Sequence, residues 1–261
     1  MGKIYVGTSG YSYADWRGTF YPEDTDSKDM LKHYARVFNC VELNFTYYRI
    51  PGPSTIASMV RNTPPDFQFT VKANEATTHQ QDPTVLEAFK RAIEPAVEAD
   101  ELAGVLCQFP FSFKNTGPNR AYLAKLGKDL SDYTAIVEFR HDSWVTPAIF
   151  EFLRANKLAY CSVDEPDLDG LVPPVAEATA QVAYVRFHSR DASKWYAGAK
   201  ARYDYLYTKE EMSEWLPKVK ELNSEAEKTY IFFNNCHAGS AAVNATEFKQ
   251  MLAELGLLTE G

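Results

Sequence analysis

Residues 133–140 and 182–188 read YTAIVEFR and VAYVRFH, and in both stretches polar and apolar side chains alternate toward the C-terminal end. Glu138 and Arg140 stand two residues apart, as do Arg186 and His188. In a β-strand, residues i and i+2 lie on the same face. Each stretch therefore predicts a strand with one apolar face and, near its end, one polar face.

The same spacing recurs on other strand-like stretches, where the polar pairs are Glu42 and Asn44, Thr70 and Lys72, and Ser162 and Asp164. A sheet that closes on itself and is covered by helices would direct the apolar faces outward. The polar faces would then converge on one pocket, and we expect a site there.

Eight strand-like runs alternate along the chain with helix-like segments. The predicted strands are 3–9, 39–46, 67–73, 103–109, 133–140, 158–164, 182–188 and 228–234, and the predicted helices are 83–100, 118–130, 146–156, 208–222 and 245–256. Alternation of this kind indicates parallel strands joined by crossover connections. Eight repeats predict an α/β fold with a single, somewhat irregular (β/α)8 TIM barrel over residues 1–261. An open doubly wound sheet is the alternative, but no glycine-rich nucleotide-binding motif follows any strand.

Composition narrows the class of protein. Hydrophobic residues make up 45% of the 261 residues, which is enough for a sizeable core. A net charge of −8 argues against an extended surface for nucleic acid or anionic membrane. Neither a signal peptide nor a membrane span is apparent. The cysteines form no C-x-x-C pair, so we expect buried thiols in a reducing cytoplasm; they are Cys40, Cys107, Cys161 and Cys236.

The converging polar residues suggest acid–base chemistry on a small polar or anionic molecule. We expect the catalytic groups to be Glu42, Glu138, Asp164 and His188. Cations suited to a phosphate or carboxylate are Lys72, Arg140 and Arg186, and neutral ligand-binding candidates are Ser9, Asn44, Gln108 and Asn234. Lys72 would instead suit a Schiff base if burial lowered its pKa. The alternative is a network that satisfies only itself, because buried charges must be paired.

A metal is a weaker possibility. The carboxylates and His188 could bind Mg²⁺ or Mn²⁺, but three nearby cations would compete for the same oxygens. We therefore predict no metal and no cofactor, and the sequence leaves the oligomeric state open.

Aromatic residues follow several strands. Tyr11 and Trp16 come after the first predicted strand, Trp144 after the fifth, and Trp195 and Tyr196 after the seventh. Such residues at a pocket rim suit stacking on a sugar or nucleobase. Alternatively, they pack the loops onto the barrel.

Many ordered motifs resemble the YecE-like family, also known as domain of unknown function 72. They are Gly7-Thr8-Ser9-Gly10-Tyr11, Phe20-Tyr21-Pro22, Val41-Glu42, Gln108-Phe109-Pro110, Val137 to His141, Arg186 with His188, and Phe233-Asn234-Asn235. The resemblance spans nearly the whole chain. It implies a TIM barrel and, beyond a loose analogy to sugar isomerases, no reaction. Departures are Phe45 and Ser189, where the family commonly has Ser and Gly, and Ser240, where it has Tyr.

Three functional hypotheses follow. The first is an enzyme, an isomerase or a hydrolase, that acts on a small anionic ligand such as a phosphorylated sugar. The second is a non-catalytic binding or regulatory protein that recognises the same kind of ligand. The third and weakest is a metal-dependent hydrolase or nuclease.

Overall fold

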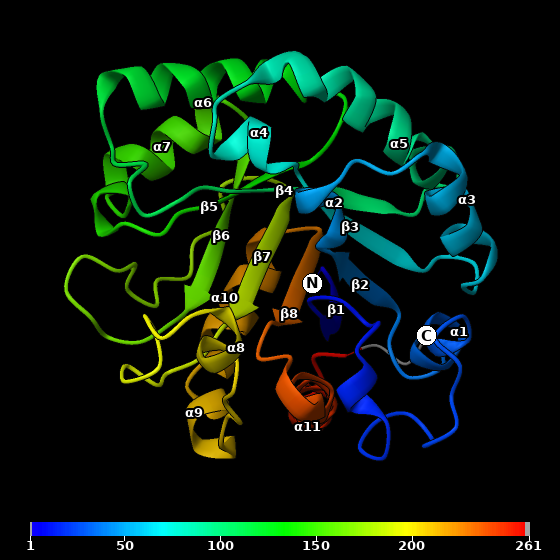
Figure 1. The fold of residues 1–261 in the computed structure, drawn as a ribbon. Coiled ribbons are helices and arrows are strands. Elements are labelled where there is room, and N and C mark those ends of the chain that lie inside the picture. Colours follow the sequence, from blue (N-terminus) through cyan, green and yellow to red (C-terminus); the bar gives the residue numbers. More distant parts are fainter. Residues whose placement is uncertain (1, 259–261) are drawn as a thin grey trace.

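Eight parallel strands form the centre of the computed structural model, which describes residues 2–258 (Figure 1). Each strand from β2 to β8 pairs with its sequence neighbour in that range, and β8 also pairs with β1, so the predicted TIM barrel is confirmed. The strands are β1 (Lys3–Thr8), β2 (Cys40–Leu43), β3 (Gln68–Lys72), β4 (Leu102–Gln108), β5 (Ala135–Glu138), β6 (Leu158–Asp164), β7 (Val182–Phe187) and β8 (Lys228–Phe233). Residues 1 and 259–261 of the predicted domain lie outside the described residues.

Helices surround the strands, as Figure 1 shows. They are α1 (Met30–Tyr34), α2 (Phe45–Tyr48), α3 (Pro53–Arg61), α4 (Glu75–Thr78), α5 (Leu86–Glu98), α6 (Gly117–Asp129), α7 (Pro147–Ala155), α8 (Ala199–Arg202), α9 (Lys209–Ser213), α10 (Leu216–Glu225) and α11 (Ser240–Glu254). Helices α6 and α7 match their predicted segments closely. Each begins with a threonine cap, Thr116 or Thr146, followed within two residues by a proline that needs no backbone partner.

Other predicted helices differ in their details. The segment predicted over 208–222 is two helices, α9 and α10, with Pro217 in the first turn of the second. Proline lacks the N–H that a continuous helix would need, so it suits that start. Helix α11 begins at Ser240 rather than near residue 245. Helix α3 was not predicted at all.

The connection between β6 and β7 contains no helix among the described residues. An extended segment covers the edge of β6 instead. Its Thr179 hydroxyl donates to the Leu158 carbonyl over 2.6 Å and accepts from the Tyr160 N–H over 2.8 Å. Because this connection has no helix among the described residues, the outer face of β6 packs against other elements than it would in a regular barrel.

The barrel closes where β1 meets β2. A single parallel bridge joins Ser9 to Glu42. A side chain at Gly7 would overlap the carbonyl oxygen of Cys40, so glycine permits the two strands to approach this closely. Closure brings the C-terminal end of β2 next to that of β1.

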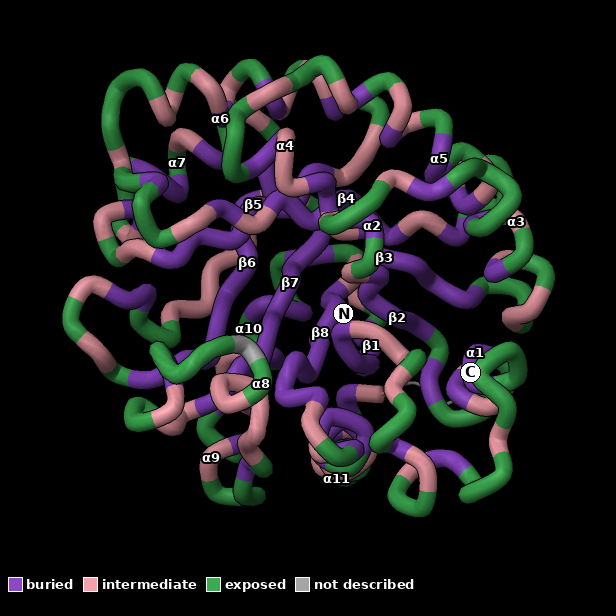
Figure 2. The backbone as a smooth tube through the Cα atoms, in the orientation of Figure 1, coloured by how far each residue is buried: buried purple, intermediate pink, exposed green. Residues whose placement is uncertain are grey.

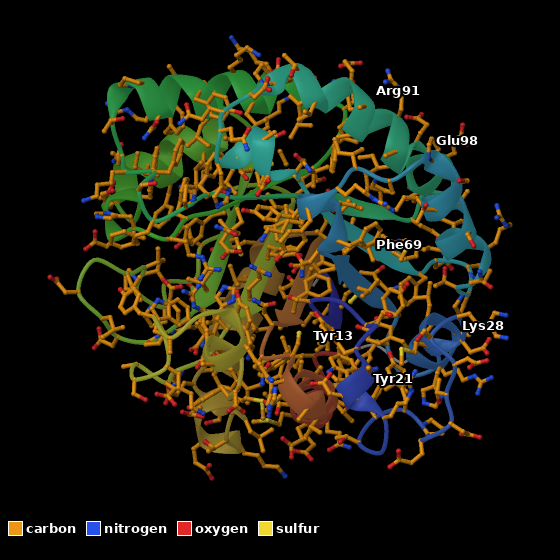
Figure 3. The ribbon with its side chains drawn as sticks, in the orientation of Figure 1. Tyr13, Tyr21, Lys28, Phe69, Arg91 and Glu98 are labelled. Atoms are coloured by element: carbon orange, nitrogen blue, oxygen red, sulfur yellow. The ribbon has the colours of Figure 1, made fainter. Side chains whose placement is uncertain are left out.

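Burial follows the strands, and exposed residues lie along the outer sides of the helices (Figure 2). Apolar side chains such as Phe69 fill the space between strands and helices, whereas Arg91 and Glu98 lie on the outer surface of α5 (Figure 3). The barrel interior toward the N-terminal ends of the strands is aromatic: the ring centres of Tyr5 and Tyr230 stack 4.8 Å apart. No helix within residues 2–258 combines the length and apolar character that crossing a bilayer requires.

Candidate functional site

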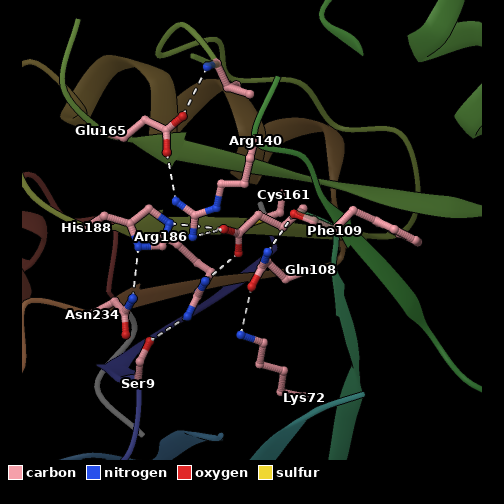
Figure 4. Close-up of polar contacts among 12 residues, drawn as sticks. Ser9, Lys72, Gln108, Phe109, Arg140, Cys161, Glu165, Arg186, His188 and Asn234 are labelled. Atoms are coloured by element: carbon pink, nitrogen blue, oxygen red, sulfur yellow. Dashed lines mark hydrogen bonds and ion pairs between the residues drawn. The ribbon is translucent and has the colours of Figure 1, made fainter. Parts of the chain in front are cut away.

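An arginine lies between two carboxylates at the centre of the barrel. The guanidinium of Arg186, on β7, donates to Glu42 over 2.7 Å and also pairs with Glu138. Glu42, on β2, accepts further hydrogen bonds from Asn44 at 3.0 Å and from the Tyr184 hydroxyl at 2.7 Å. Both carboxylates are fully buried. Figure 4 shows the upper part of this network, including Arg186 and its contact with Ser9.

A second arginine extends the network toward the C-terminal ends of the strands. Arg140, which follows β5, pairs with Glu138 at 2.5 Å and with Glu165 at 2.8 Å (Figure 4). Burial would raise the pKa of Glu138, but Arg140 and Arg186 beside it hold that pKa well below its usual value. Glu138 is therefore an ionised, fully paired carboxylate at neutral pH.

His188 is a neutral imidazole in this network. Burial and the charge of Arg140 lower its pKa well below the usual value. Its Nε2 lies 3.2 Å from Glu138, and its Nδ1 lies 3.0 Å from the Asn234 amide nitrogen. The neutral ring satisfies both contacts when Nε2 donates to Glu138 and Nδ1 accepts from Asn234.

The expectation that Asp164 faces the interior is wrong. Its carboxylate accepts hydrogen bonds from the Tyr207 hydroxyl and the Trp215 indole, each at 2.7 Å. Arg190 adds an ion pair at 2.7 Å. Asp164 therefore contacts residues outside the barrel, among them Trp215 just before α10, and holds the segment after β7 against the barrel.

The register between β6 and β7 explains the correction. Val163 pairs with Arg186, whose side chain points inward, whereas Asp164 pairs with Phe187, whose side chain points outward. The inward positions of this strand are thus Cys161, Val163 and then Glu165, which follows the strand. Glu165 was not among the predicted site residues, although it continues the two-residue spacing after Val163.

Glu165 makes the protein's stability depend on pH. Burial, opposed by Arg140, raises its pKa to about 7, well above the unfolded value of about 4.3. Between these values the folded state binds more protons, so the stability that Glu165 contributes falls as the pH rises from about 4.5 to 7. Glutamine at this position keeps an oxygen that accepts a hydrogen bond from Arg140, but it does not titrate.

We therefore predict that the free energy of unfolding of Glu165→Gln, relative to that of the wild type, increases by about 2–3 kcal/mol as the pH rises through this range. Urea unfolding of both proteins at several pH values measures the difference. A stability difference that is constant or that shrinks with rising pH would contradict the prediction.

A cavity of about 440 Å³ opens above the network at the C-terminal ends of the strands. Its polar walls include Asn44, Lys72, Arg140, Arg186 and Asn234. The aromatic walls are Tyr11, Tyr13, Phe45, Tyr47, Tyr48 and Tyr203. Within residues 2–258, no aspartate or glutamate lines this cavity. The predicted catalytic groups Glu42, Glu138 and His188 lie beneath it, behind the arginines.

Lys72, at the end of β3, is the cation of this wall that lacks a carboxylate partner among the described residues. Its ammonium group donates to the Gln108 side chain over 2.9 Å (Figure 4) and lies 4.5 Å from the centre of the Tyr47 ring. Burial and the nearby charge of Arg186 lower its pKa to about 8. A measurable fraction of Lys72 is therefore a neutral amine at physiological pH.

The predicted aromatic rim is only partly formed. Tyr11 lines the cavity, but Trp16 and Trp144 are fully buried. The Trp16 indole donates to the Cys236 carbonyl at 2.7 Å, and that of Trp144 donates to the Phe113 carbonyl at 2.5 Å. Both tryptophans pack loops onto the barrel. Tyr47 and Tyr203 also line the cavity but were not among the predicted site residues, because they lie outside the strands.

Within the described residues, no three His, Cys, Asp or Glu side chains are grouped as metal ligands would be. Glu42 and Glu138 point their oxygens toward arginine instead. The donor set considered for Mg²⁺ is further divided because Asp164 lies on the other face of β6.

Fold and site together define a TIM-barrel protein with a charged, aromatic-walled cavity at the C-terminal ends of its strands. The chain belongs to the family described as "Protein of unknown function DUF72", which matches residues 5–259. It is 32% identical over 269 residues to UPF0759 protein YunF of Bacillus subtilis (strain 168), covering 95% of this chain and 94% of YunF.

Two solved structures have the same fold. The DUF72 family protein TM1631 of Thermotoga maritima MSB8 is 45% identical, with a TM-score of 0.89 over 96% of this chain and 99% of TM1631. The DUF72 family protein EF0366 of Enterococcus faecalis V583 is 29% identical, with a TM-score of 0.85 over 98% of this chain and 97% of EF0366.

Proposed function

We propose that the chain is an enzyme that acts by proton transfer on a small anionic organic molecule, such as a phosphorylated sugar, in the cavity above the barrel. Lys72 is the observation that carries the proposal. It is a cation in the cavity wall without a carboxylate partner among the described residues, and its pKa of about 8 lies near physiological pH. Groups with such pKa values are effective general acids and bases.

This assignment moves the chemistry from the carboxylates to Lys72. Glu42, Glu138 and His188 do not line the cavity, and each is hydrogen-bonded to fixed partners. In the proposal they hold Arg186 and Arg140 in place, and the positive wall attracts an anionic ligand. The neutral Lys72 amine takes a proton from the substrate, and the ammonium form returns it.

The cavity walls also suit such a ligand. The cavity combines tyrosine rings, which pack against sugar rings, with the side-chain amides of Asn44 and Asn234, which exchange hydrogen bonds with hydroxyl groups. Its volume of about 440 Å³ lies in the range of small-molecule sites. An isomerase needs only proton transfer between neighbouring atoms and is therefore the first class to test; a hydrolase is the second.

A binding or regulatory protein is the competing function. It is favoured by the complete pairing of Glu42 and Glu138, which leaves these carboxylates no contact with the cavity. Such a protein would bind the same ligands and leave them unchanged.

A panel of phosphorylated sugars and sugar acids tests the two functions together. Thermal unfolding detects binding, because a ligand at about 100 times its Kd stabilises the protein by roughly 2.7 kcal/mol. Proton NMR of the same mixtures detects conversion. We expect one class of compound both to bind and to be converted. Binding without conversion would contradict the enzyme and support the binding protein, and neither effect across the panel would contradict both.

A further inference from the structure

A second, smaller cavity lies beside the first. It has a volume of about 250 Å³, and Arg140 and Tyr203 line both cavities. Its other walls come from the end of β4 and from the segments after β3, β4, β6 and β7, so it opens on the same face of the barrel. They are His79, Gln108, Pro110, Phe111, Leu171, Trp195, Tyr196 and Arg202. The two cavities are therefore adjacent at Arg140 and Tyr203.

The charge of this second cavity is positive. Arg140 and Arg202 line it, and no aspartate or glutamate of the described part of the chain does. Both terminal nitrogens of Arg140 are already bound to Glu138 and Glu165. Arg202 takes part in no ion pair among the described residues. The charge that remains for a ligand is therefore that of Arg202.

Trp195 holds Arg202 in place. The Nε of Arg202 donates to the Trp195 carbonyl over 2.7 Å, and its guanidinium carbon lies 4.8 Å from the centre of the indole ring. Arg140 lies 5.8 Å from the same ring. The contacts of Arg202 with Trp195 use the Nε and the face of its guanidinium. They leave the two terminal nitrogens of Arg202 without a hydrogen-bond partner among the described residues. Two parallel N–H donors of this kind match a phosphate or a carboxylate.

The position and size of the cavity also fit a small anion. Arg202 is the last residue of α8, in the segment that follows β7, and the segments after the last strands of TIM barrels frequently bind phosphate. A volume of about 250 Å³ is smaller than that of typical sites for whole ligands and suits a single anionic group. Trp195 is buried, and its ring forms an apolar wall beside Arg202.

We infer that the second cavity is a subsite in which Arg202, held by Trp195, binds the phosphate or carboxylate group of the substrate. The substrate then has two ends: an anionic group at Arg202 and a reacting carbon skeleton near Lys72. This inference rests on the proposed function for the role of the reacting end, but anion binding at Arg202 can be measured without any turnover.

Calorimetric titration of the full chain with inorganic phosphate, and separately with acetate, tests the subsite. We expect saturable binding of at least one of these anions by the wild type. Arg202→Gln should weaken it at least about tenfold, because it removes the charge and keeps the polar shape. Arg91→Gln, on the outer surface of α5 (Figure 3), is the matched control and should bind like the wild type.

Lys72→Met separates this inference from the proposed function, since Lys72 does not line the second cavity. We expect it to bind the anion within about threefold of the wild type. Binding that is lost in Lys72→Met but kept in Arg202→Gln would place the anion in the first cavity and overturn the subsite. Wild-type binding weaker than about 10 mM for both anions would overturn it as well.

Discussion

Replacing Arg186 with methionine lowers the free energy of unfolding by about 3–5 kcal/mol. Arg186 is 2% exposed, and its guanidinium joins Glu42 to Glu138 across the barrel. Methionine fills much of the space but leaves two buried carboxylates facing each other without the charge between them. An uncompensated buried charge is among the most destabilising changes a single substitution can make.

Arg154→Met is the control for this prediction. Arg154 also contacts two carboxylates, Glu151 and Glu177, but its side chain is 37% exposed. Exposed ion pairs contribute about 0–1 kcal/mol, so we expect a loss of less than about 1 kcal/mol. Urea unfolding of both variants measures the difference, and equal losses would contradict the account of the network.

The destabilisation by Arg186→Met should also depend on pH. Without Arg186, only Arg140 remains to oppose the effect of burial on Glu138, so the pKa of Glu138 rises. The folded variant then binds this proton more tightly than the folded wild type, so the loss of stability shrinks as the pH falls through the range in which carboxyl groups titrate. A loss that grows toward acid pH would contradict this reasoning.

Lys72→Met should reduce the turnover of any substrate found in the cavity by about 10²–10⁴-fold, the usual contribution of a general acid or base. Lys72 lines the cavity and is only partly buried, so methionine should leave the fold intact. Lys220→Met, on the exposed surface of α10, is the matched control and should keep full activity.

Lys72→Arg separates proton transfer from simple charge. Arginine keeps the positive charge near Gln108 but does not lose its proton at physiological pH. We expect this variant to keep ligand binding and to lose turnover to nearly the same degree as Lys72→Met. The activity of the wild type should rise with pH up to about 8, as the neutral amine forms. Full turnover by the arginine variant would show that Lys72 supplies only charge.

The sequence predicted the barrel well because the alternation of polar and apolar residues on its strands reflects two physical surroundings. Apolar residues such as Phe69 face the helices, and residues such as Arg186 face the interior. That contrast also brought Glu42, Glu138 and His188 together correctly in one network. The alternation of polar and apolar residues could not show that the arginines lie between this network and the cavity, because that depends on side-chain geometry.

Strand β6 shows where alternation fails. Both of its faces end in a carboxylate, Asp164 outside and Glu165 inside. The polar pattern alone therefore did not show which alternate residues of the strand face the interior. The outer face tolerates Asp164 because the Trp215 indole and Arg190 satisfy it. Only the pairing with β7 decides between the two phases.

Residues supplied by loops were the hardest to predict. Tyr203 and Arg202 reach the cavities from the long segment between β7 and β8, and no strand period marks them. Trp16 and Trp144 follow strands, as rim residues would, yet they are buried because their indoles meet backbone carbonyls. Aromatic composition alone does not distinguish these two roles.

The pKa of Lys72 in the full chain tests the central claim most directly. NMR of protein labelled at the lysine side chains, followed against pH, measures it, and comparison with Lys72→Met assigns the signal. We predict a pKa of about 8, because burial and Arg186 disfavour the ammonium form. A pKa near the ordinary value of about 10.4 would mean that Lys72 stays charged at physiological pH and would contradict its role in proton transfer.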